Sequence, residues 1–380
     1  MNLALRDVRR NKLRFALTAL GVGMLLGVVI AMTGIYEGAL ADALALPRAL
    51  RADLWVVQQR TFGPFAEPSR IPRDTRELIR RMPGVAAAGA VTFQTVQTRV
   101  GPKPVRLFLE GYEVGRLGGP ANIIAGHGLT ESHYQIVVDT SSGLHLGENV
   151  PLGPYHDPYT VVGLTRGMVS SGGDPMAWVN LLDAQALQFA VPPAIERREQ
   201  ASGRSPPTTT DINAVLVRLS PGASVKAVAA DIARWKHLSA VPEAEEESYL
   251  TLFVIQKMQQ QLGMFMGVLV AVSAVIITLI IYTLTMDKLR SIATLKFIGA
   301  PDRVIIAMIV QQALALGLSG FGVGLVLIEQ VKGYFPRRVQ IETRDLLIIL
   351  AIVTVVCLAG SMLGVRAAVK VNAAEALASG

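Results

Sequence analysis

The stretch FALTALGVGMLLGVVIAMTGIY, residues 15–36, decides the fold because it contains no Asp, Glu, Lys or Arg. At a rise of 1.5 Å per residue, about 20 apolar residues cross a hydrocarbon core of about 30 Å. Three more uncharged runs follow, at residues 258–286, 304–328 and 346–365. A soluble protein of this size could not easily bury four uncharged segments of this length in its core. The sequence therefore predicts four membrane-spanning helices.

The composition supports a chain that is partly solvated by lipid. Its 380 residues are 51% hydrophobic and 17% charged, whereas an ordinary soluble protein is about 25% charged. The apolar content excludes a disordered chain, and the 35 glycines follow no collagen period. A single cysteine, Cys357, excludes an intrachain disulfide and a cysteine-rich zinc site.

Basic residues beside the spans predict the orientation in the membrane. Arg9 and Arg10 precede the first span, Lys288 lies between the second and third, and Arg366 follows the fourth. These positions place both termini and the link between spans two and three in the cytoplasm. The link at 331–344 is also basic, but four spans with cytoplasmic termini leave it outside. We therefore expect a multi-pass protein of the inner (plasma) membrane.

A cleaved signal peptide is the competing interpretation of the N-terminal region. A basic segment and an apolar run precede Ala39-Leu40-Ala41, which fits a small-residue cleavage site. The apolar run is longer than the apolar region of a signal peptide, which usually has about 7–15 residues. The length of the run favours a retained first span.

The segment between the first two spans is long enough to bury its own core. Residues 38–102 and 211–248 have the pattern of an α/β part, while 103–210 has short strands between Gly and Pro turns and predicts a β-rich insert. The expected strands of the α/β part are 52–59, 85–100 and 212–219, with helices over 72–83 and 225–235; those of the insert are 105–111, 135–138 and 159–164. Residues 197–207 are polar and predict a loop.

No motif for catalysis is present. The sequence has no phosphate-binding loop, no G-x-S-x-G and no H-E-x-x-H. Its five histidines show no metal-ligand spacing, so no metal site is expected. The acidic run Glu243, Glu245, Glu246 and Glu247 is typical of a solvated face or linker. We expect neither an enzyme nor a bound cofactor in this chain.

Each span contains a Gly-x-x-x-Gly pair. This spacing lets helix backbones approach closely in a membrane. One such pair is weak evidence, but one in every span favours tight packing within the chain and between two copies. The pairs are Gly23/Gly27, Gly263/Gly267, Gly320/Gly324 and Gly360/Gly364.

The segment MDKLRSIATLKFIGAP, residues 286–301, stands between spans two and three. A basic, amphipathic short helix that ends at glycine can lie along the cytoplasmic face, and an ordinary basic loop is the plainer alternative. The string resembles the R-E-I-[GA]-x-L-[KR]-A-[LI]-G-A segment of the FtsX-like ABC permeases, the MacB, LolC/LolE and DevC-type group. Ser291 and Phe297 depart from that pattern, which leaves the exact ATPase contact open.

The resemblance extends over the whole chain. Residues 9–14 (RRNKLR) resemble the family's amphipathic N-terminal helix, 52–57 (ADLWVV) its first outer strand, and 372–377 (NAAEAL) its C-terminal tail. It implies a mechanotransmission permease paired with a second copy or a paralogue, a separate ABC ATPase subunit that binds ATP and Mg, and an adaptor protein in the periplasm. It implies no nucleic-acid partner. The residues that it implies for ATPase coupling are Lys288, Leu289, Arg290, Ile292, Leu295, Lys296, Ile298 and Gly299.

These observations predict a membrane α-helical protein with four transmembrane helices and a large α+β extracytoplasmic domain, in which a porter-like split α/β part carries a β-rich insert. The expected boundaries are 1–14 N-terminal helix, 15–37 first span, 38–248 extracytoplasmic domain, 249–286 stalk helix and second span, 287–303 coupling helix, 304–330 third span, 331–344 outer loop, 345–366 fourth span and 367–380 tail.

Two functions fit this organisation. The first is export or extraction of a lipid, lipoprotein, peptide or small molecule from the periplasmic side. The second is a transmembrane signalling lever that activates an extracytoplasmic partner such as a cell-wall hydrolase. The long extracytoplasmic segment resembles the MacB arrangement, which favours export.

Overall fold

The chain divides into two compact units. A computed structural model describes residues 12–65, 67–130, 133–189, 210–235, 237–298, 301–335 and 337–369. We call the unit formed by 1–38 and 258–380 the helical unit, and the unit formed by 39–257 the sheet unit. Residues 1–11 of the N-terminal helix expected over 1–14, most of the tail and the loop at 197–207 lie outside the described residues.

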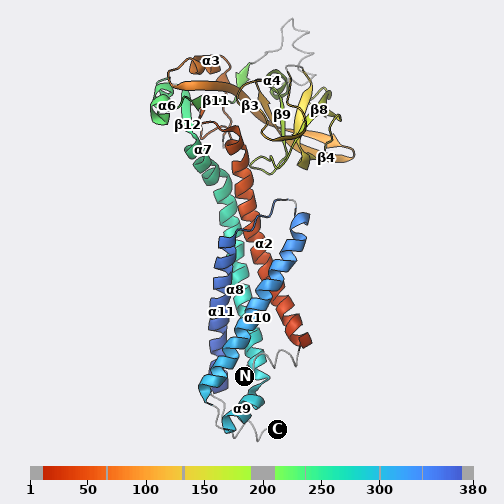
Figure 1. The fold of residues 1–380 in the computed structure, drawn as a ribbon, viewed down its shortest axis with the longest axis vertical. Helices are drawn as coiled ribbons and strands as arrows, with labels where there is room; N and C mark the ends of the chain where they lie inside the picture. Colours follow the sequence, from red (N-terminus) through yellow and green to blue (C-terminus); the bar gives the residue numbers. More distant parts are fainter. Residues whose placement is uncertain are drawn as a thin grey trace, which may run out of the picture. The chain divides into compact units, whose positions relative to one another are not determined.

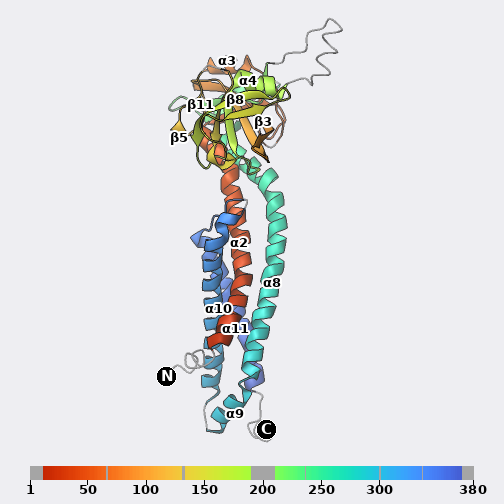
Figure 2. The same cartoon turned by 90° about the vertical axis from the view of Figure 1, so that its right-hand side faces the viewer.

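Four long apolar helices account for the predicted spans (Figures 1 and 2). Their most apolar windows have mean hydropathies of 2.4, 2.8, 1.9 and 2.8 in chain order. In Figure 1, α10 runs obliquely to α11, and the two helices contact each other. The helices are α2 (Lys12–Leu50), α8 (Gln256–Met286), α10 (Asp302–Val331) and α11 (Thr343–Val369).

Helix α2 is longer than the predicted first span. It continues past residue 37 to Leu50, because residues 39–46 are almost all Ala and Leu, which are strong helix formers. Pro47 lies inside the last turn, and Arg51 then takes a left-handed conformation with φ 49°. The start of the segment expected to be extracytoplasmic is therefore helical.

The core of the helical unit is built from β-branched and leucine side chains. Val22 and Ile30 of α2 are buried with Ile277 and Ile281 of α8. Residues of α10 and α11 join the same cluster, so all four helices share one interior. Between them lie the short helix α9 (Leu289–Phe297) and the 3₁₀ turn η3 (Lys332–Tyr334).

A ten-stranded sheet organises the sheet unit, in the order β12-β1-β11-β3-β4-β9-β6-β8-β5 with β7 paired to β8. A separate two-stranded pair joins β2 (Ile71–Pro72) and β10 (Asp211–Ile212). The strands of the large sheet are β1 (Leu54–Gln58), β3 (Val85–Val100), β4 (Lys103–Tyr112), β5 (Ile123–Gly126), β6 (Gln135–Asp139), β7 (Asn149–Leu152), β8 (Asp157–Thr165), β9 (Met176–Asn180), β11 (Ala214–Leu219) and β12 (Leu238–Pro242).

The helices of this unit are short. Asn180 caps α4 by accepting a hydrogen bond from the Leu182 amide, and Ser224 caps α6 by accepting one from the Ala227 amide. The helices are α3 (Thr75–Arg80), α4 (Leu181–Gln188), α6 (Val225–Ala233) and α7 (Glu243–Tyr249), with a 3₁₀ turn η1 (Thr140–Ser142) and a π-helical segment η2 (Leu250–Ile255).

The α/β part and the β-rich insert share one sheet. Strands β3 and β4 pair without interruption from Val91↔Tyr112 to Val100↔Lys103. The hydrogen-bonded path therefore runs from the α/β part into the residues expected to form the β-rich insert, and both belong to the same sheet. The predicted fold class, four spanning helices with a large α/β domain, is confirmed.

Alternation along β1 shows how its side chains divide between two cores. Leu54 and Val56 point to the cluster that includes Ile79 of α3 and Ile232 of α6. Trp55 and Val57 point to the opposite face of the sheet, into a second cluster. Because successive strand residues face opposite sides, a strand buried on both faces reads as a continuous apolar run.

Candidate functional site

Helix α9 begins directly after α8 ends. The Lys288 amide donates to the Thr285 carbonyl at 3.1 Å, and the Ile292 amide donates to the Lys288 carbonyl at 2.9 Å, which opens the new helix. Its end is marked by the Ile298 amide, which donates to the Thr294 carbonyl at 3.1 Å. Pro301 then holds an extended conformation before α10. Gly299 lies outside the described residues.

One edge of α9 is anchored in the helical unit. Ile292 and Ala293 are 1% and 0% exposed, and Ile292 packs in the cluster that contains Ile305 and Ile309 of α10. At the end of the helix, Phe297 and Ile298 are 75% and 78% exposed. The loop thus has a buried foot and an exposed apolar tip.

The structure separates two of the residues that the resemblance implies for coupling. Ile292 is buried, whereas Ile298 lies beyond the last helical turn, which ends at Phe297, and is exposed. The structure does not describe three further side chains of this segment, those of Leu289, Arg290 and Leu295. Phe297 is the second exposed apolar residue at this end of α9, next to Ile298. From the sequence, Phe297 is noted only as a departure from the family pattern.

Ion pairs flank α9 on both sides. Arg14 of α2 donates to Asp287 at 2.5 Å, and Lys296 lies 3.3 Å from Asp302 at the start of α10. Exposed pairs of this kind contribute about 0–1 kcal/mol each, so they orient the loop more than they stabilise it. The Lys296 side chain is only 18% exposed and already has an acidic partner in its own chain.

Three of the four glycine pairs pack against another helix of the same chain. A Cβ on Gly324 would lie 2.8 Å from the Gly23 carbonyl oxygen and 3.0 Å from the Gly27 amide nitrogen. The backbones of α2 and α10 therefore touch where Gly23, Gly27, Gly320 and Gly324 meet. Without side chains at these positions, the helices approach as closely as main-chain atoms allow.

The other two pairs behave differently from each other. Added Cβ atoms on Gly360 and Gly364 would lie 2.8 Å from Thr278 Oγ1 and 2.9 Å from Thr285 Oγ1, so α11 packs closely on α8. Added Cβ atoms on Gly263 and Gly267 would meet no atom of the described residues within 4 Å. Packing of Gly263 and Gly267 against a second copy, the other part of the prediction, stays a prediction.

A buried carboxyl group at the beginning of the helix that leads into α8 was missed by sequence reasoning. Glu246 of α7 is 0% exposed, and neither of its carboxylate oxygens has a hydrogen-bond partner among the described residues. Gly63, at φ +84°, lies so close that a Cβ there would be 1.8 Å from Glu246 Oε2. Burial raises the pKa of Glu246 from 4.5 to about 8. Glu246 is therefore buried, whereas the acidic run to which it belongs was expected to be a solvated face or linker.

The buried state of Glu246 predicts a pH-dependent stability. An unfolded Glu releases its proton near pH 4.5 and the folded one near pH 8, so stability falls as pH rises across this window. The difference corresponds to on the order of 5 kcal/mol at the upper end, or roughly 10 °C in melting temperature. Replacing Glu246 by Gln keeps the shape of the neutral acid, so we expect the variant to match wild type at low pH and to melt higher near pH 8.

The three tryptophans supply the measurement, because Trp55, Trp178 and Trp235 all lie in the sheet unit. Thermal unfolding of the full chain, followed by tryptophan fluorescence over this pH range, reports on that unit. Glu245→Gln is the matched control, since Glu245 is exposed on the same helix. If Glu246→Gln and Glu245→Gln have the same pH profile, the carboxyl of Glu246 is not held neutral.

Metal-binding clusters of three or more His, Cys, Asp or Glu are absent from the described part of the chain. His133 lies 2.5 Å from Asp183 through Nδ1, and that hydrogen bond raises the pKa of His133. This contact ties the loop before β6 to α4.

Two family models match the sequence. One is described as a MacB-like periplasmic core domain and matches residues 15–235; the other is described as the FtsX-like permease C-terminal domain and matches residues 263–373. The first covers α2 and most of the sheet unit. The second covers α8, α9, α10 and α11, and it includes the candidate coupling segment.

Several curated proteins are similar over their full lengths. An uncharacterised ABC transporter permease of Mycobacterium tuberculosis strain H37Rv is 22% identical over 373 residues, which is 98% of each chain. A putative hemin transport system permease protein of Staphylococcus epidermidis is 20% identical over 398 residues, covering all of both chains.

Solved structures of isolated extracytoplasmic regions also resemble part of the chain. The periplasmic region of MacB from Actinobacillus actinomycetemcomitans is 13% identical, with a TM-score of 0.34 over 50% of this chain and 88% of that one. The extracellular domain of the YknZ transporter from Gram-positive bacteria is 14% identical, with a TM-score of 0.30 over 46% of this chain and 88% of that one.

Proposed function

Because the chain belongs to the FtsX-like permeases of ABC transporters that carry a MacB-like periplasmic core domain, we propose that it couples ATP hydrolysis by a separate ATPase subunit to export or extraction from the periplasmic side. The observation that carries this proposal is the form of α9, which has a buried foot at Ile292 and an exposed apolar tip at Phe297 and Ile298. Such a tip leaves apolar surface in water unless a partner covers it.

The proposed partner at this tip is the ATPase subunit, which binds ATP and Mg. The sequence offers no phosphate-binding loop of its own. Ile292 and Ala293 are packed into the helical unit. A displacement of α9 by a partner would therefore be transmitted to the spans through packed side chains rather than through a flexible loop.

The proposed setting is the inner (plasma) membrane with both termini and α9 in the cytoplasm. The basic residues beside the spans support this orientation. The sheet unit would then lie on the extracytoplasmic side, where a periplasmic adaptor protein and the transported molecule would reach it.

A second copy of the chain, or a paralogue, is proposed to cover α8. Gly263 and Gly267 are the Gly-x-x-x-Gly pair whose added Cβ atoms would meet nothing within 4 Å among the described residues. Small residues at this spacing let the backbone of another helix approach closely, which supports a helix of a second copy as the partner of this face.

The proposed substrate class is a lipid, lipoprotein, peptide or small molecule. The staphylococcal relative is named as a hemin transport permease, and at 20% identity that name supports a small amphipathic molecule as one candidate. Because this relative matches over the full length of the chain, its name also supports transport rather than signalling as the function.

ATP hydrolysis should require a second chain. We expect the purified chain, reconstituted in nanodiscs, to hydrolyse no ATP, and an ATPase subunit co-purified from the native membrane to hydrolyse ATP faster with the chain than without it. Phosphate release measured for each component and for the complex checks this. Hydrolysis by the isolated chain, or an ATPase indifferent to its presence, would contradict the proposed division of labour.

A further inference from the structure

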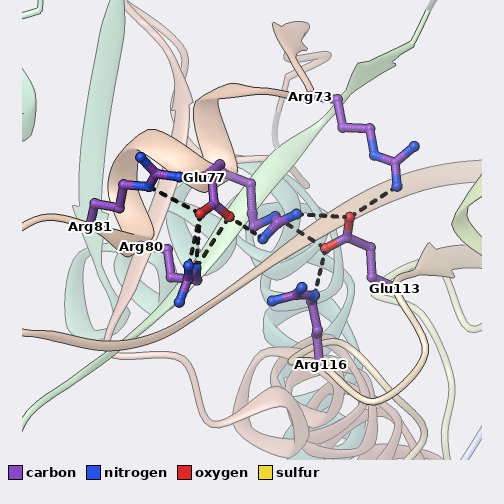
Figure 3. A network of polar contacts seen from close by, with 7 residues as sticks. Arg73, Glu77, Arg80, Arg81, Glu113 and Arg116 are labelled. Atoms are coloured by element: carbon purple, nitrogen blue, oxygen red, sulfur yellow. Dashed lines mark hydrogen bonds and ion pairs between the residues drawn. The ribbon is translucent and has the colours of Figure 1, made fainter.

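A cluster of arginines surrounds two glutamates beside helix α3 of the sheet unit (Figure 3). We call it the arginine cluster. Most of its members lie between β2 and β3, and the remaining ones lie in the turn that follows β4, where the sheet order brings β4 next to β3. It consists of Arg73, Arg76, Arg80, Arg81 and Arg116 around Glu77 and Glu113.

Glu113 forms the buried centre of the cluster. Its side chain is 9% exposed and lies 3.1 Å from Arg73, 3.2 Å from Arg76 and 3.4 Å from Arg116. The Arg76 side chain is itself only 14% exposed. A buried carboxylate held by three guanidinium groups fixes the side chains around it, so these arginines are not free surface rotamers.

Glu77 forms the second centre. It lies 2.8 Å from Arg76, 2.8 Å from Arg80 and 3.2 Å from Arg81, and Arg76 therefore bridges both carboxylates. Hydrogen bonds from Arg80, and then from Arg81, lower the pKa of Glu77 to about 2. Glu77 therefore remains ionised at any physiological pH, and its ion pairs with these arginines persist across that range.

The cluster carries more positive charge than its carboxylates neutralise. Five guanidinium groups against two carboxylates leave 5 − 2 = +3, and the exposed Asp74 beside them reduces this to +2. No other acidic group contacts the five arginines in the part of the chain that the structure describes. The excess charge is reachable, because the Arg80, Arg81 and Arg116 side chains are 47%, 74% and 43% exposed.

An apolar side chain lies on the same helix. Leu78 of α3 is 51% exposed, between Glu77 and the two arginines that hold it. Pre-organised arginines beside an exposed apolar residue are typical of the centre of a protein–protein interface, where Arg and apolar anchors carry most of the binding energy. A free phosphate would satisfy the guanidinium groups but would leave Leu78 in water.

We propose that the arginine cluster is a docking site for an acidic, partly apolar segment of a protein partner. Carboxylates of that segment take the guanidinium N–H groups that Glu77 and Glu113 leave free, and an apolar side chain covers Leu78. Planar guanidinium groups match carboxylates in paired hydrogen bonds, and the two internal glutamates remove much of the entropy cost of fixing them. This inference concerns the sheet unit alone and does not depend on the proposed ATPase coupling.

The test uses the full chain in nanodiscs of zwitterionic lipid and a short fluorescein-labelled peptide of glutamate and leucine. Fluorescence anisotropy measures its affinity, with the glutamine-for-glutamate peptide as reference. The triple variant Arg80→Gln, Arg81→Gln and Arg116→Gln leaves Arg73 and Arg76 on Glu113, and we expect it to bind the acidic peptide about tenfold or more weakly, since each charge-assisted contact is strong.

A matched triple variant controls for net charge. Arg99→Gln, Arg166→Gln and Arg234→Gln removes the same charge from exposed positions elsewhere in the sheet unit, and we expect it to bind nearly as wild type does. Melting followed by tryptophan fluorescence shows whether both variants are folded. Should the cluster triple fail to fold, Arg81→Gln alone, at the most exposed position, carries the comparison with Arg166→Gln.

Three outcomes would overturn the proposal. Equal weakening in both triples would mean that only net charge matters. Equal binding of the acidic and amide peptides would mean that the carboxylates are not recognised. Binding of inorganic pyrophosphate or of phosphatidylglycerol vesicles through these arginines, without binding of the acidic peptide, would assign the cluster to phosphate groups instead of a protein.

Discussion

Replacing Gly324 by valine should unfold the helical unit at a markedly lower temperature than wild type. The first atom of the new side chain would lie 2.8 Å from the Gly23 carbonyl oxygen and 3.0 Å from the Gly27 amide nitrogen. Both are main-chain atoms of a facing helix, so no rotamer change relieves the clash and the two helices must separate. Overpacking of this kind costs typically about 1–3 kcal/mol, and more where backbone must move.

The single cysteine provides the readout. Cys357 of α11 is 1% exposed in the core of the helical unit. A maleimide dye that becomes fluorescent on reaction with a thiol therefore reports unfolding of that unit during heating. We expect earlier labelling in Gly324→Val, while the tryptophan fluorescence of the sheet unit changes little.

Gly263→Val is the matched control, because it makes the same substitution in a pair whose added Cβ atoms would meet no atom of the described residues within 4 Å. We expect Cys357 labelling as in wild type and weaker self-association in cross-linking experiments, since valine at position 263 would keep the helix of a second copy from approaching α8 closely. If Gly263→Val lowers the melting temperature as much as Gly324→Val does, close packing of α2 and α10 is not what makes Gly324 special.

The contrast between these two glycines also marks where sequence reasoning stops. The spacing of Gly263/Gly267 and of Gly320/Gly324 is identical, so the pattern predicts close approach for both. Which helix approaches, and whether it belongs to the same chain, depends on the arrangement of the four spans. That arrangement is a property of the folded unit and not of any single span.

The spans and most strands were predictable for a simple reason. Absence of charge over about 20 residues indicates a membrane span in a long apolar chain, and the Val- and Thr-rich residues 91–100 indicate a strand. Helix α2 extends beyond the predicted span at 15–37, because absence of charge marks a span but not the end of a helix. The Ala- and Leu-rich residues that follow continue the helix because both residues are strong helix formers.

Burial of single charged side chains was not predictable. Glu246 stands among three other glutamates within five residues, and nothing in that composition distinguishes the one that turns inward. Its position depends on the close approach of Gly63 from a loop far away in the chain. The arginine cluster is a similar case, since Glu113 reaches Arg73 and Arg76 only because β3 and β4 are paired.

The second large effect concerns the tip of α9. Ile298→Glu should abolish stimulation of the ATPase subunit while leaving the chain folded. Ile298 is 78% exposed, so the new carboxylate costs nothing within the chain. If the ATPase covers the tip, the same carboxylate is buried without a partner in the complex, at a cost of about 3–5 kcal/mol, or a loss of more than a hundredfold in affinity.

Tyr334→Glu provides the control, since Tyr334 is 88% exposed in the link between α10 and α11, which the proposed topology places on the other side of the membrane. The most direct measurement is the ATPase rate of the complex reconstituted with wild type, Ile298→Glu or Tyr334→Glu, with Cys357 labelling to show that each chain is folded. The account predicts a rate at the level of the isolated ATPase for Ile298→Glu and a wild-type rate for Tyr334→Glu. Wild-type stimulation by Ile298→Glu would contradict α9 as the coupling element.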